Sequence, residues 1–284
     1  MESEIIRNIY AFRQHLICSE KAQATIEKYL RDLKAFLTWK GERELNKELT
    51  LQYKSYLMKS YQPASVNSIL SSLNSFFTFL ERHDCKVKTL RIQKRIFASE
   101  DRELTKKEYE KLLDAAWKNK KKRLYYLLQT ISSTGIRVSE LRAITIEAVR
   151  SGKATIYCKG KMRLVILPQM LCRMLQRYCK EEKIERGAVF ITKSGKNLDR
   201  SNIWHELKRL SQMAGVAQEK VFPHNFRHLF ARTYYAQQRD VVRLADILGH
   251  ANINTTRIYT MESGKVHQRQ LQQMGLLRLE RDVG

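Results

Sequence analysis

Apolar residues recur at helical spacing along almost the whole of this chain, and a single region has the composition of β-strands. One of the helical runs consists of Ile5, Ile9, Phe12 and Leu16. In the exceptional region, the stretches ATIYC (154–158) and RLVIL (163–167) flank the short turn KGKM. We expect AVFIT, residues 188–192, to add an edge strand. The pattern predicts a mainly α-helical fold with a small β-sheet, an α+β protein.

The 284 residues suit two domains better than one. Residues 1–85 read as four helices, the fourth beginning at Pro63, and form the first predicted domain. Residues 102–284 form the second domain, which opens with a capping box from Thr105 to Glu108. Its further helices are expected at 123–133, 169–182, 200–214, 224–237, 240–248 and 264–275.

Between these domains, residues 86–101 read KVKTLRIQKRIFASED and break the helical pattern. Their basic residues all precede the first acidic one, Glu100, and are Lys86, Lys88, Arg91, Lys94 and Arg95. We interpret the segment as an extended basic linker that lies along a phosphate backbone. An ordinary solvated connector is the alternative interpretation.

The charge of the chain points to a class of partner. An excess of 53 Lys and Arg over 29 Asp and Glu gives a net charge of +24. Because this excess is spread over the whole chain, it favours nucleic acid as the partner over a merely basic surface. Five cysteines without a CxxC pair argue against a disulfide framework and fit a reducing cytoplasm. We expect neither a signal peptide nor a membrane span, since no apolar run approaches the ~18 residues that a span needs.

Two arginines and a lysine are candidates for binding a phosphate. Arg137 lies in STGIRVSEL just before a helix start, and Arg227 follows His224 by three positions, on the same helical face. Two guanidinium groups can clamp a phosphate during transfer, because arginine keeps its charge and binds bidentately. Lys159 lies in the turn CKGKMR, where it is either a solvated lysine or a proton donor for a leaving oxygen.

The stretch HNFRH, residues 224–228, allows three interpretations: a zinc site, a packed helix start or half of an active site. Asn225 stands where the metalloprotease motif HExxH needs its glutamate, and no nearby cluster supplies a third ligand, so we expect no metal. After Pro223, His224 lies at a helix start, where backbone N–H groups attract anions. His228 is expected to pack or to support the site.

The stretch LGHANINTTRIYT, residues 248–260, completes the candidate set. Gly249 is expected to end a helix and to place His250 at an exposed corner. Asn254 can cap a following turn that carries Tyr259. A lone tyrosine there belongs to the core by default, but one that faces a clamped phosphate would be a nucleophile.

Five motifs in this order resemble the tyrosine recombinases of the phage integrase family. They are TGIRVSEL, the CKG turn followed by Arg-x-Val, HNFRH, LGH, and the tyrosine nine residues after that histidine. The resemblance covers about residues 104–275, and the helical N-terminal part resembles the family's core-DNA-binding domain. We expect no arm-binding domain ahead of residue 3. The chain is therefore closer to the simple Xer-like recombinases, including cointegrate resolvases of the TnpI type.

The resemblance implies a site-specific recombinase that cleaves and rejoins DNA through a 3′-phosphotyrosine, in integration, excision or cointegrate resolution of a mobile element. Tyr259 would attack the scissile phosphate, and His224 would help to take its proton. Lys159 would protonate the departing 5′-oxygen. The groups that stabilise the transition state would be Arg137, Arg227 and His250.

Further expectations concern partners and alternatives. Glu140 either orients Arg137 or a histidine, or simply favours the helix start. The implied partners are double-stranded DNA with inverted-repeat core sites and three further copies of the chain, as a tetramer on two sites, with accessory DNA-bending proteins as further candidates. The helix at 264–275 would pack on its own domain or on a neighbour. No cofactor is expected. A catalytically silent DNA-binding relative and a type IB topoisomerase-like enzyme are the alternatives.

Overall fold

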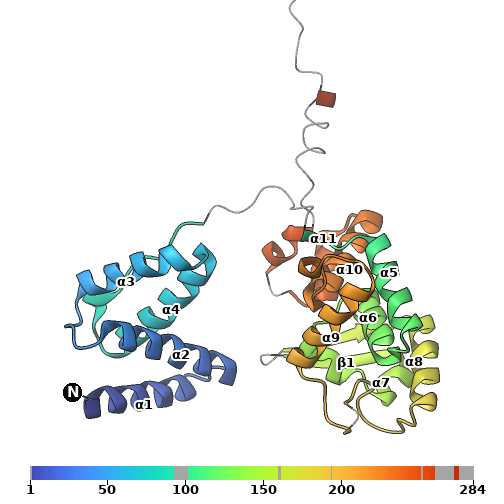
Figure 1. Cartoon of the computed structure of the whole chain (residues 1–284), viewed down its shortest axis with the longest axis horizontal. Helices are drawn as coiled ribbons and strands as arrows, with labels where there is room; N and C mark the ends of the chain where they lie inside the picture. The colour runs from blue at the N-terminus through green and yellow to red at the C-terminus, as the bar shows by residue number, and fades with distance from the viewer. Residues whose placement is uncertain are drawn as a thin grey trace, which may run out of the picture. The chain divides into compact units, whose positions relative to one another are not determined.

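The computed structural model divides the chain into two compact units, Met1–Lys94 and Arg95–Gly284, which we call unit 1 and unit 2. Each is described here by itself (Figure 1). The residues that the structure describes are 2–92, 102–158, 161–192, 194–250, 252–259 and 272–274. Among the helices of this described part, none combines the length and the apolarity that a membrane crossing requires.

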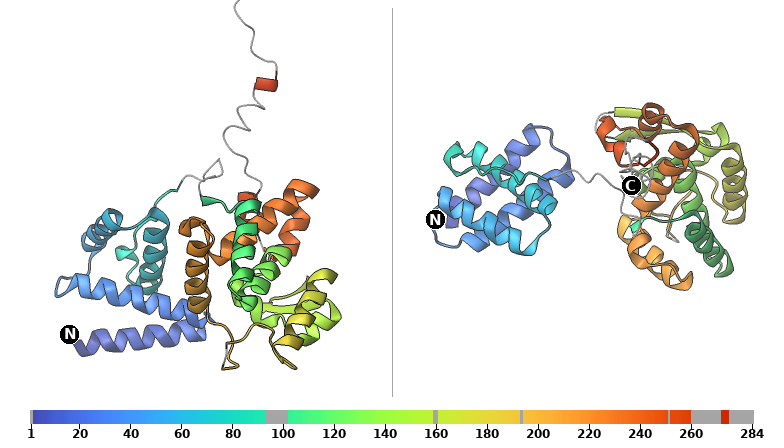
Figure 2. Two further views of the ribbon diagram at one scale, coloured as in Figure 1. Left: turned by 45° about the vertical axis from the view of Figure 1, so that its right-hand side comes forward. Right: turned by 90° about the horizontal axis from the view of Figure 1, so that it is seen from above.

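Unit 1 is built from the four predicted helices. They are α1 (Glu2–Cys18), α2 (Gln23–Lys40), α3 (Lys47–Ser60) and α4 (Pro63–Phe79). Pro63 is the first residue of α4, as expected, and Asn46 caps α3 by accepting a hydrogen bond from the Leu49 N–H at 2.9 Å. Phe12, Leu33 and Phe77 are fully buried in the core that the helices share. Figure 2 shows the arrangement of these helices in two further views.

The first residues of the predicted linker are docked on unit 1. The side chain of Asn74 donates to the Val87 carbonyl at 2.8 Å and accepts from the Val87 N–H at 3.0 Å. Asn67 makes the same pair of bonds with Leu90, at 2.9 and 2.7 Å. Val87 is buried, whereas Lys88 and Arg91 are exposed. The backbone is extended here, as predicted, but it is held by α4 as far as Leu90, because two amide side chains replace the pairing that a strand would provide.

The helices of unit 2 follow the predicted segments closely. The α-helices are α5 (Lys106–Lys118), α6 (Lys122–Thr134), α7 (Ile146–Ser151), α8 (Gln169–Glu181), α9 (Arg200–Met213), α10 (Pro223–Gln238) and α11 (Val241–Leu248). The predicted capping box is present, with Thr105 and Glu108 bonded reciprocally at the start of α5. Helix α10, which carries His224 and Arg227, packs against α6, and Arg137 follows the end of α6.

The predicted hairpin is the only sheet in the described residues. Strand β1 (Lys153–Cys158) pairs antiparallel with β2 (Lys161–Ile166), and Ile156 lies opposite Arg163. Lys161 and Met162, expected in the turn, belong to β2. One face of the hairpin is buried through Ala154, Ile156 and Val165. The other face is exposed through Tyr157, Met162, Leu164 and Ile166.

The prediction that residues 188–192 form an edge strand is wrong. The Val189 N–H donates to the Ile144 carbonyl at 2.8 Å, and isolated bridges join Ala188 to Thr145 and Ile191 to Asn197. The hydrogen bonds of this segment therefore go to the residues before α7 and to its own loop. The apolar residues that suggested a strand, Val189 and Phe190, are buried in the core of unit 2 instead.

Two short 3-10 helices follow α11 and lead to the last candidate residue. They are η5 (Ile253–Thr255) and η6 (Arg257–Tyr259). Gly249 ends α11 with a left-handed φ of 64°, as predicted. The predicted helix at 264–275 lies outside the described residues except for 272–274.

Candidate active site

Arg137 is presented by the turn between α6 and η3 (Val138–Ala143). Gly135 ends α6 with a φ of 64°, and a Cβ atom there would meet the Phe230 ring at 2.5 Å, so both the backbone and the space require glycine. Arg137 then stands as the N-cap of η3. Its Nη1 donates to Glu140 Oε1 at 3.0 Å, while its side chain stays 32% exposed. The guanidinium is thus held from one side and open on the other.

Glu140 holds two arginines with one carboxylate. Its Oε2 accepts from the Arg137 N–H at 2.7 Å and from Arg163 Nη2 at 2.6 Å. Burial alone would raise the pKa of this carboxyl, but the Arg137 N–H and the charges of Arg163 and Arg137 more than offset it and keep that pKa below its usual range. Both interpretations of Glu140 apply, since it accepts at the helix start and orients Arg137. Among the described residues, no histidine is hydrogen-bonded to it.

Arg227, on α10, is 1% exposed. It donates to the carbonyl of Gly135, to that of Leu248 at 2.8 Å through Nη2, and from the same Nη2 to His250 at 2.9 Å. Burial, and then the charge of Arg137, lower its pKa to about 10, so it remains a cation at neutral pH. This guanidinium donates to neutral acceptors, and among the described residues no carboxylate is hydrogen-bonded to it.

His250 is half-buried, not at the exposed corner that the sequence suggested. Its Nε2 lies 2.9 Å from Arg227 Nη2, and its Nδ1 lies 2.8 Å from Thr256 Oγ1. A guanidinium can only donate, so Nε2 accepts and the ring proton is on Nδ1, which donates to Thr256. Burial and the charge of Arg227 lower the pKa of His250 to about 4, in keeping with a neutral ring.

Tyr259 is buried at 5% exposure between two of the predicted histidines. Its ring lies 4.9 Å from that of His228 and 6.2 Å from that of His250. The turn that leads to it is capped by Asn252, which accepts from the Asn254 N–H, so the predicted cap at Asn254 is wrong by two positions. Burial raises the pKa of the phenol, against the lowering effect of the Arg227 guanidinium.

His224 and His228 lie on the same face at the start of α10, with their rings 5.2 Å apart. Partial burial and the charge of Arg227 lower the pKa of His224. Burial, followed by its proximity to His224, lowers the pKa of His228 to about 4. The Nε2 atom of His228 is buried without a hydrogen-bond partner. In the described residues, no third His, Cys, Asp or Glu joins this pair in a group able to hold a metal.

The structure thus brings five of the six predicted catalytic residues into one region of unit 2, which consists of Arg137, His224, Arg227, His250 and Tyr259. The sixth, Lys159, lies in the turn between β1 and β2 and outside the described residues. Of the predicted DNA-binding residues, Lys86, Lys88 and Arg91 are on unit 1. Lys94 and Arg95 are outside the described part.

Two residues of the site escaped the sequence analysis, Arg163 and Thr256. Arg163 was noticed only as part of an Arg-x-Val motif. A signal was present, because strand alternation places it with Ile156 and Val165 on the buried face of the hairpin. An arginine on the covered face of a hairpin is stabilised by an acidic partner, and Glu140 provides one for Arg163 at 2.6 Å.

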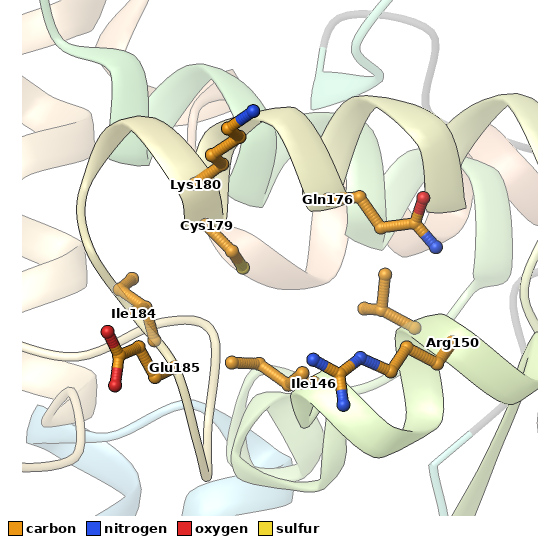
Figure 3. Close-up of a pocket in the computed structure, with 8 residues that line it drawn as sticks. Ile146, Arg150, Gln176, Cys179, Lys180, Ile184 and Glu185 are labelled. Atoms are coloured by element: carbon orange, nitrogen blue, oxygen red, sulfur yellow. The ribbon is translucent and has the colours of Figure 1, made fainter.

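A hollow of unit 2 lies away from these residues. A cavity of about 440 Å³ lies between α7 and α8, where Gln176 and Cys179 face Ile146 and Arg150 (Figure 3). None of the candidate residues lines it. A duplex is too large for such a hollow, and a phosphate in DNA needs a charged surface site instead, so the cavity does not compete with the arginine cluster as the site of chemistry.

Comparisons with known proteins show the family to which the chain belongs. Residues 102–265 match the phage integrase family, and residues 9–84 match the N-terminal SAM-like domain of phage integrases. Tyrosine recombinase XerA of Thermococcus kodakarensis is 30% identical over 261 residues, which cover 89% of each chain.

Two solved structures share the fold. The XerH recombinase bound to its difH substrate has a TM-score of 0.66 at 21% identity, covering 88% of this chain and 79% of that one. A lambda integrase tetramer bound to a Holliday junction has a TM-score of 0.70 at 16% identity, covering 98% and 80%. By its family matches and by its identity to XerA over most of both chains, this protein belongs to the phage integrase family and is a tyrosine recombinase.

Proposed function

We propose that this tyrosine recombinase cuts and rejoins duplex DNA at specific sites through a 3′-phosphotyrosine on Tyr259. One observation carries the assignment: the phenol of Tyr259 is buried beside Arg227 and between two histidine rings. A tyrosine that served only the core would not need two arginines nearby. Attack by Tyr259 exchanges one phosphodiester for another, which conserves the bond and lets the freed 5′-hydroxyl reverse the step on a partner duplex.

Arg137 and Arg227 bind the non-bridging oxygens of the phosphate in this proposal. Arg227 is fixed by two backbone carbonyls, and Arg137 is fixed by Glu140 on one side. Because both are set before DNA arrives, they stabilise the additional charge of the transition state without having to reorganise. Their mutual repulsion in the free protein is relieved when an anion binds between them.

His250 supplies a further hydrogen bond to the phosphate. In the free protein its Nε2 accepts from Arg227 and has no proton to offer. A bound phosphate offsets the arginine charges that depress the pKa of His250. The ring then gains a proton on Nε2 and donates it to the phosphate, in place of accepting from Arg227.

His224 helps to remove the proton of Tyr259. A free phenol has a pKa of about 10, so it requires a base at neutral pH. Because burial and Arg227 lower the pKa of His224, that ring is available in its neutral form. Lys159 acts at the other end of the reaction, as the acid that protonates the 5′-oxygen. Its position in the hairpin turn and the resemblance to the family support this role.

The proposed partner is a duplex with inverted-repeat core sites, on which four copies assemble as a tetramer over two sites. The net charge of +24 supports binding to a polyanion. The structural neighbours include recombinases bound to DNA, among them a lambda integrase tetramer on a Holliday junction. The basic residues 86–95 add phosphate contacts, and the C-terminal residues 264–275 contribute to contacts between copies. Accessory DNA-bending proteins and a cytoplasmic location stay predictions.

The test is the trapping of a covalent adduct. Duplexes that carry candidate inverted repeats from the DNA flanking the gene are nicked close to the scissile phosphate, so that the short product diffuses away and the adduct accumulates. The full-length protein is expected to form an adduct that resists SDS, in EDTA. Tyr259→Phe is expected to bind the same duplex and form none, whereas Tyr157→Phe, which alters an exposed tyrosine on β1, is expected to react normally. An adduct with Tyr259→Phe would refute the assignment.

A further inference from the structure

Arg163 joins three elements of unit 2 that carry different parts of the site. It lies on β2, with its side chain 16% exposed. Its Nη2 donates to Glu140 Oε2, on η3, at 2.6 Å, and its Nη1 donates to the carbonyl of Ile247, in α11, at 2.8 Å. Strand β2 follows the turn that contains Lys159, η3 follows Arg137, and α11 precedes His250. One guanidinium therefore connects the surroundings of three proposed functional groups.

Arg163 bonds to and packs against the C-terminal end of α11. Arg163 bonds to the carbonyl of Ile247, and Arg227 bonds to that of the next residue, Leu248, so two arginines satisfy consecutive carbonyls at the C-terminus of one helix. Gly249 lies directly under the stem of Arg163, where a Cβ atom would stand 2.3 Å from Cδ and 2.7 Å from Nε. The backbone just before His250 is thus in direct contact with Arg163.

Arg163 also determines how Glu140 can hold Arg137. A carboxylate can take a guanidinium bidentately through both of its oxygens. Here Oε2 is occupied by Arg163 and by the Arg137 N–H, and only Oε1 is left for the side chain of Arg137. Arg137 therefore keeps donors that are not engaged by Glu140. If Arg163 were absent, Glu140 would be free to take Arg137 with both oxygens and draw it away from a phosphate.

We propose that Arg163 is a positioning residue for strand cleavage. It sets Arg137 through Glu140 and sets His250 through Ile247 and Gly249, and it anchors strand β2 to both. The proposal rests on the function proposed above for Tyr259. Arg163 reaches none of the reacting atoms in this proposal; its effect is to align the groups that do.

The first experiment measures adduct formation in a single turnover, with protein saturating over the nicked duplex. Misplacing a catalytic group by 1 Å can cost about 10²-fold in rate, so Arg163→Ala is expected to react about 10- to 100-fold more slowly with DNA binding unchanged. Arg163→Lys is expected to fall between Arg163→Ala and the original protein, because lysine keeps the charge but lacks the fork. Arg173→Ala, which removes an exposed arginine from α8, serves as the control and is expected to react normally.

The substrate separates alignment of the whole site from support of the hairpin alone. A duplex with a 5′-bridging sulfur has a leaving group that needs no acid. Arg163→Ala is expected to stay slow on this duplex, because Arg137 and His250 are also displaced. Full recovery on sulfur would overturn the proposal, since only the acid would then depend on Arg163. Normal cleavage of the unmodified duplex by Arg163→Ala would overturn it too.

A second experiment uses glycines and does not depend on catalysis. Gly249→Ala introduces a side chain against Arg163, whereas Gly152→Ala introduces one at a similar left-handed φ of 72° with open space, 4.0 Å from the nearest atom. We expect Gly249→Ala to lower the melting temperature more than Gly152→Ala, and the additional loss to disappear when Arg163→Ala is also present. Additive losses would contradict the contact. This cycle can be read even if the protein forms no adduct, so failure of the inference and failure of the proposed function remain distinct.

Discussion

The two units differ in whether their buried polar atoms have hydrogen-bond partners. In unit 1, the carboxylate of Asp32 is bonded to Ser72 and Lys28, and Asn67 and Asn74 satisfy the backbone of the docked segment. In unit 2, buried atoms such as Arg227 Nε, Arg163 Nε and His228 Nε2 have no hydrogen-bond partner. Every such unpartnered buried atom found among the described residues belongs to unit 2.

The difference separates a scaffold from a site. Unsatisfied buried polar groups cost about 1–3 kcal/mol each, so each of them calls for an explanation such as a ligand that completes it. Arg163 Nε, Arg227 Nε and His228 Nε2 belong to the surroundings of the proposed site, whereas others, such as Arg123 Nε and Gln129 Nε2, lie on α6. The cluster of Arg137, Arg227 and Arg163 has Glu140 as its hydrogen-bonded carboxylate, and, after burial, its charges help to lower the pKa of His250. Such a cluster is balanced by an anion, which the proposed function supplies as a DNA phosphate.

The largest expected effect tests the role of a residue that the described cluster does not include. Lys159→Ala is expected to cleave unmodified DNA on the order of 10² to 10⁴ times more slowly, the usual cost of losing a general acid. The same variant is expected to cleave a duplex with a 5′-bridging sulfur nearly as well as the original protein, since a thiolate leaves without a proton. Arg137→Ala is expected to be slow on both duplexes, because it acts on the non-bridging oxygens.

Rates on the two duplexes, measured in a single turnover, distinguish these outcomes. If sulfur does not restore cleavage by Lys159→Ala, the acid is a different residue, and Lys161 in the same hairpin is the next to test.

A second expected effect concerns how unit 1 and its docked segment contribute to DNA binding. The slope of log affinity against log salt is about −0.9 for each phosphate contact on duplex DNA. Neutralising Lys86, Lys88, Arg91, Lys94 and Arg95 together is expected to flatten this slope by several units. The slope is measured by titration of labelled duplex at several salt concentrations. Neutralising five basic residues of α8 and its flanks, Arg173, Arg177, Lys180, Lys183 and Arg186, is the control for net charge. Equal slopes in the two variants would mean that the docked segment does not touch DNA.

A third expected effect concerns the hydrogen bonds that hold residues 86–90 on α4. Asn74→Ala leaves the N–H and the carbonyl of Val87 without partners, which is expected to cost about 1–3 kcal/mol of stability in unit 1. Hydrogen exchange measured by peptide resolves the two units, and faster exchange is expected in α4 and residues 85–90 only. Asn74→Asp still accepts from Val87 and is expected to lose less. Unchanged exchange in Asn74→Ala would show that the two hydrogen bonds between Asn74 and Val87 contribute nothing to the stability of unit 1.

The comparison also explains which features the sequence revealed. Most helices of the described part, Pro63 at a helix start, the Thr105–Glu108 capping box and Gly249 at a helix end follow from local rules and were predicted, whereas the short helix α7 was not. What local rules cannot report is where hydrogen bonds go across the fold. Residues 188–192 have the composition of a strand, yet their backbone bonds to Ile144 and to their own loop.

The same limit applies to the candidate site. Five motifs in a specific order identified its residues, but Arg163 acquires a role only because Glu140 and Ile247 lie within reach of it in space. The docking of residues 86–90 on α4 could not be predicted from the sequence either. It depends on two asparagines seven positions apart that meet the segment from one helix face.

The smallest expected effect is a dependence of stability on pH that belongs to unit 2. His228 and His250 have pKa values of about 4 in the folded protein, below the value of about 6.5 that histidine has in an unfolded chain. Between these values the unfolded chain binds more protons than the folded one, so stability is present above pH 6.5 and is lost as the pH falls toward 4. Burial opposes the protonation of both rings most strongly, and the charged groups that add to it are His224, Arg227, Arg137, Arg163 and Arg232.

Hydrogen exchange between pH 7 and pH 5, corrected for the intrinsic rate, is expected to report weaker protection in α10 and α11 at the lower pH and little change in unit 1. His228→Gln removes one of the titrating rings and is expected to reduce this dependence, whereas His205→Gln, at an exposed position of α9, is expected to leave it intact. A phosphate mimic such as vanadate should weaken the dependence as well, because an anion between the arginines raises the pKa of both histidines. An equal loss of protection in both units would remove the contrast between them, and with it the argument that unit 2 alone holds a cluster that needs an anion.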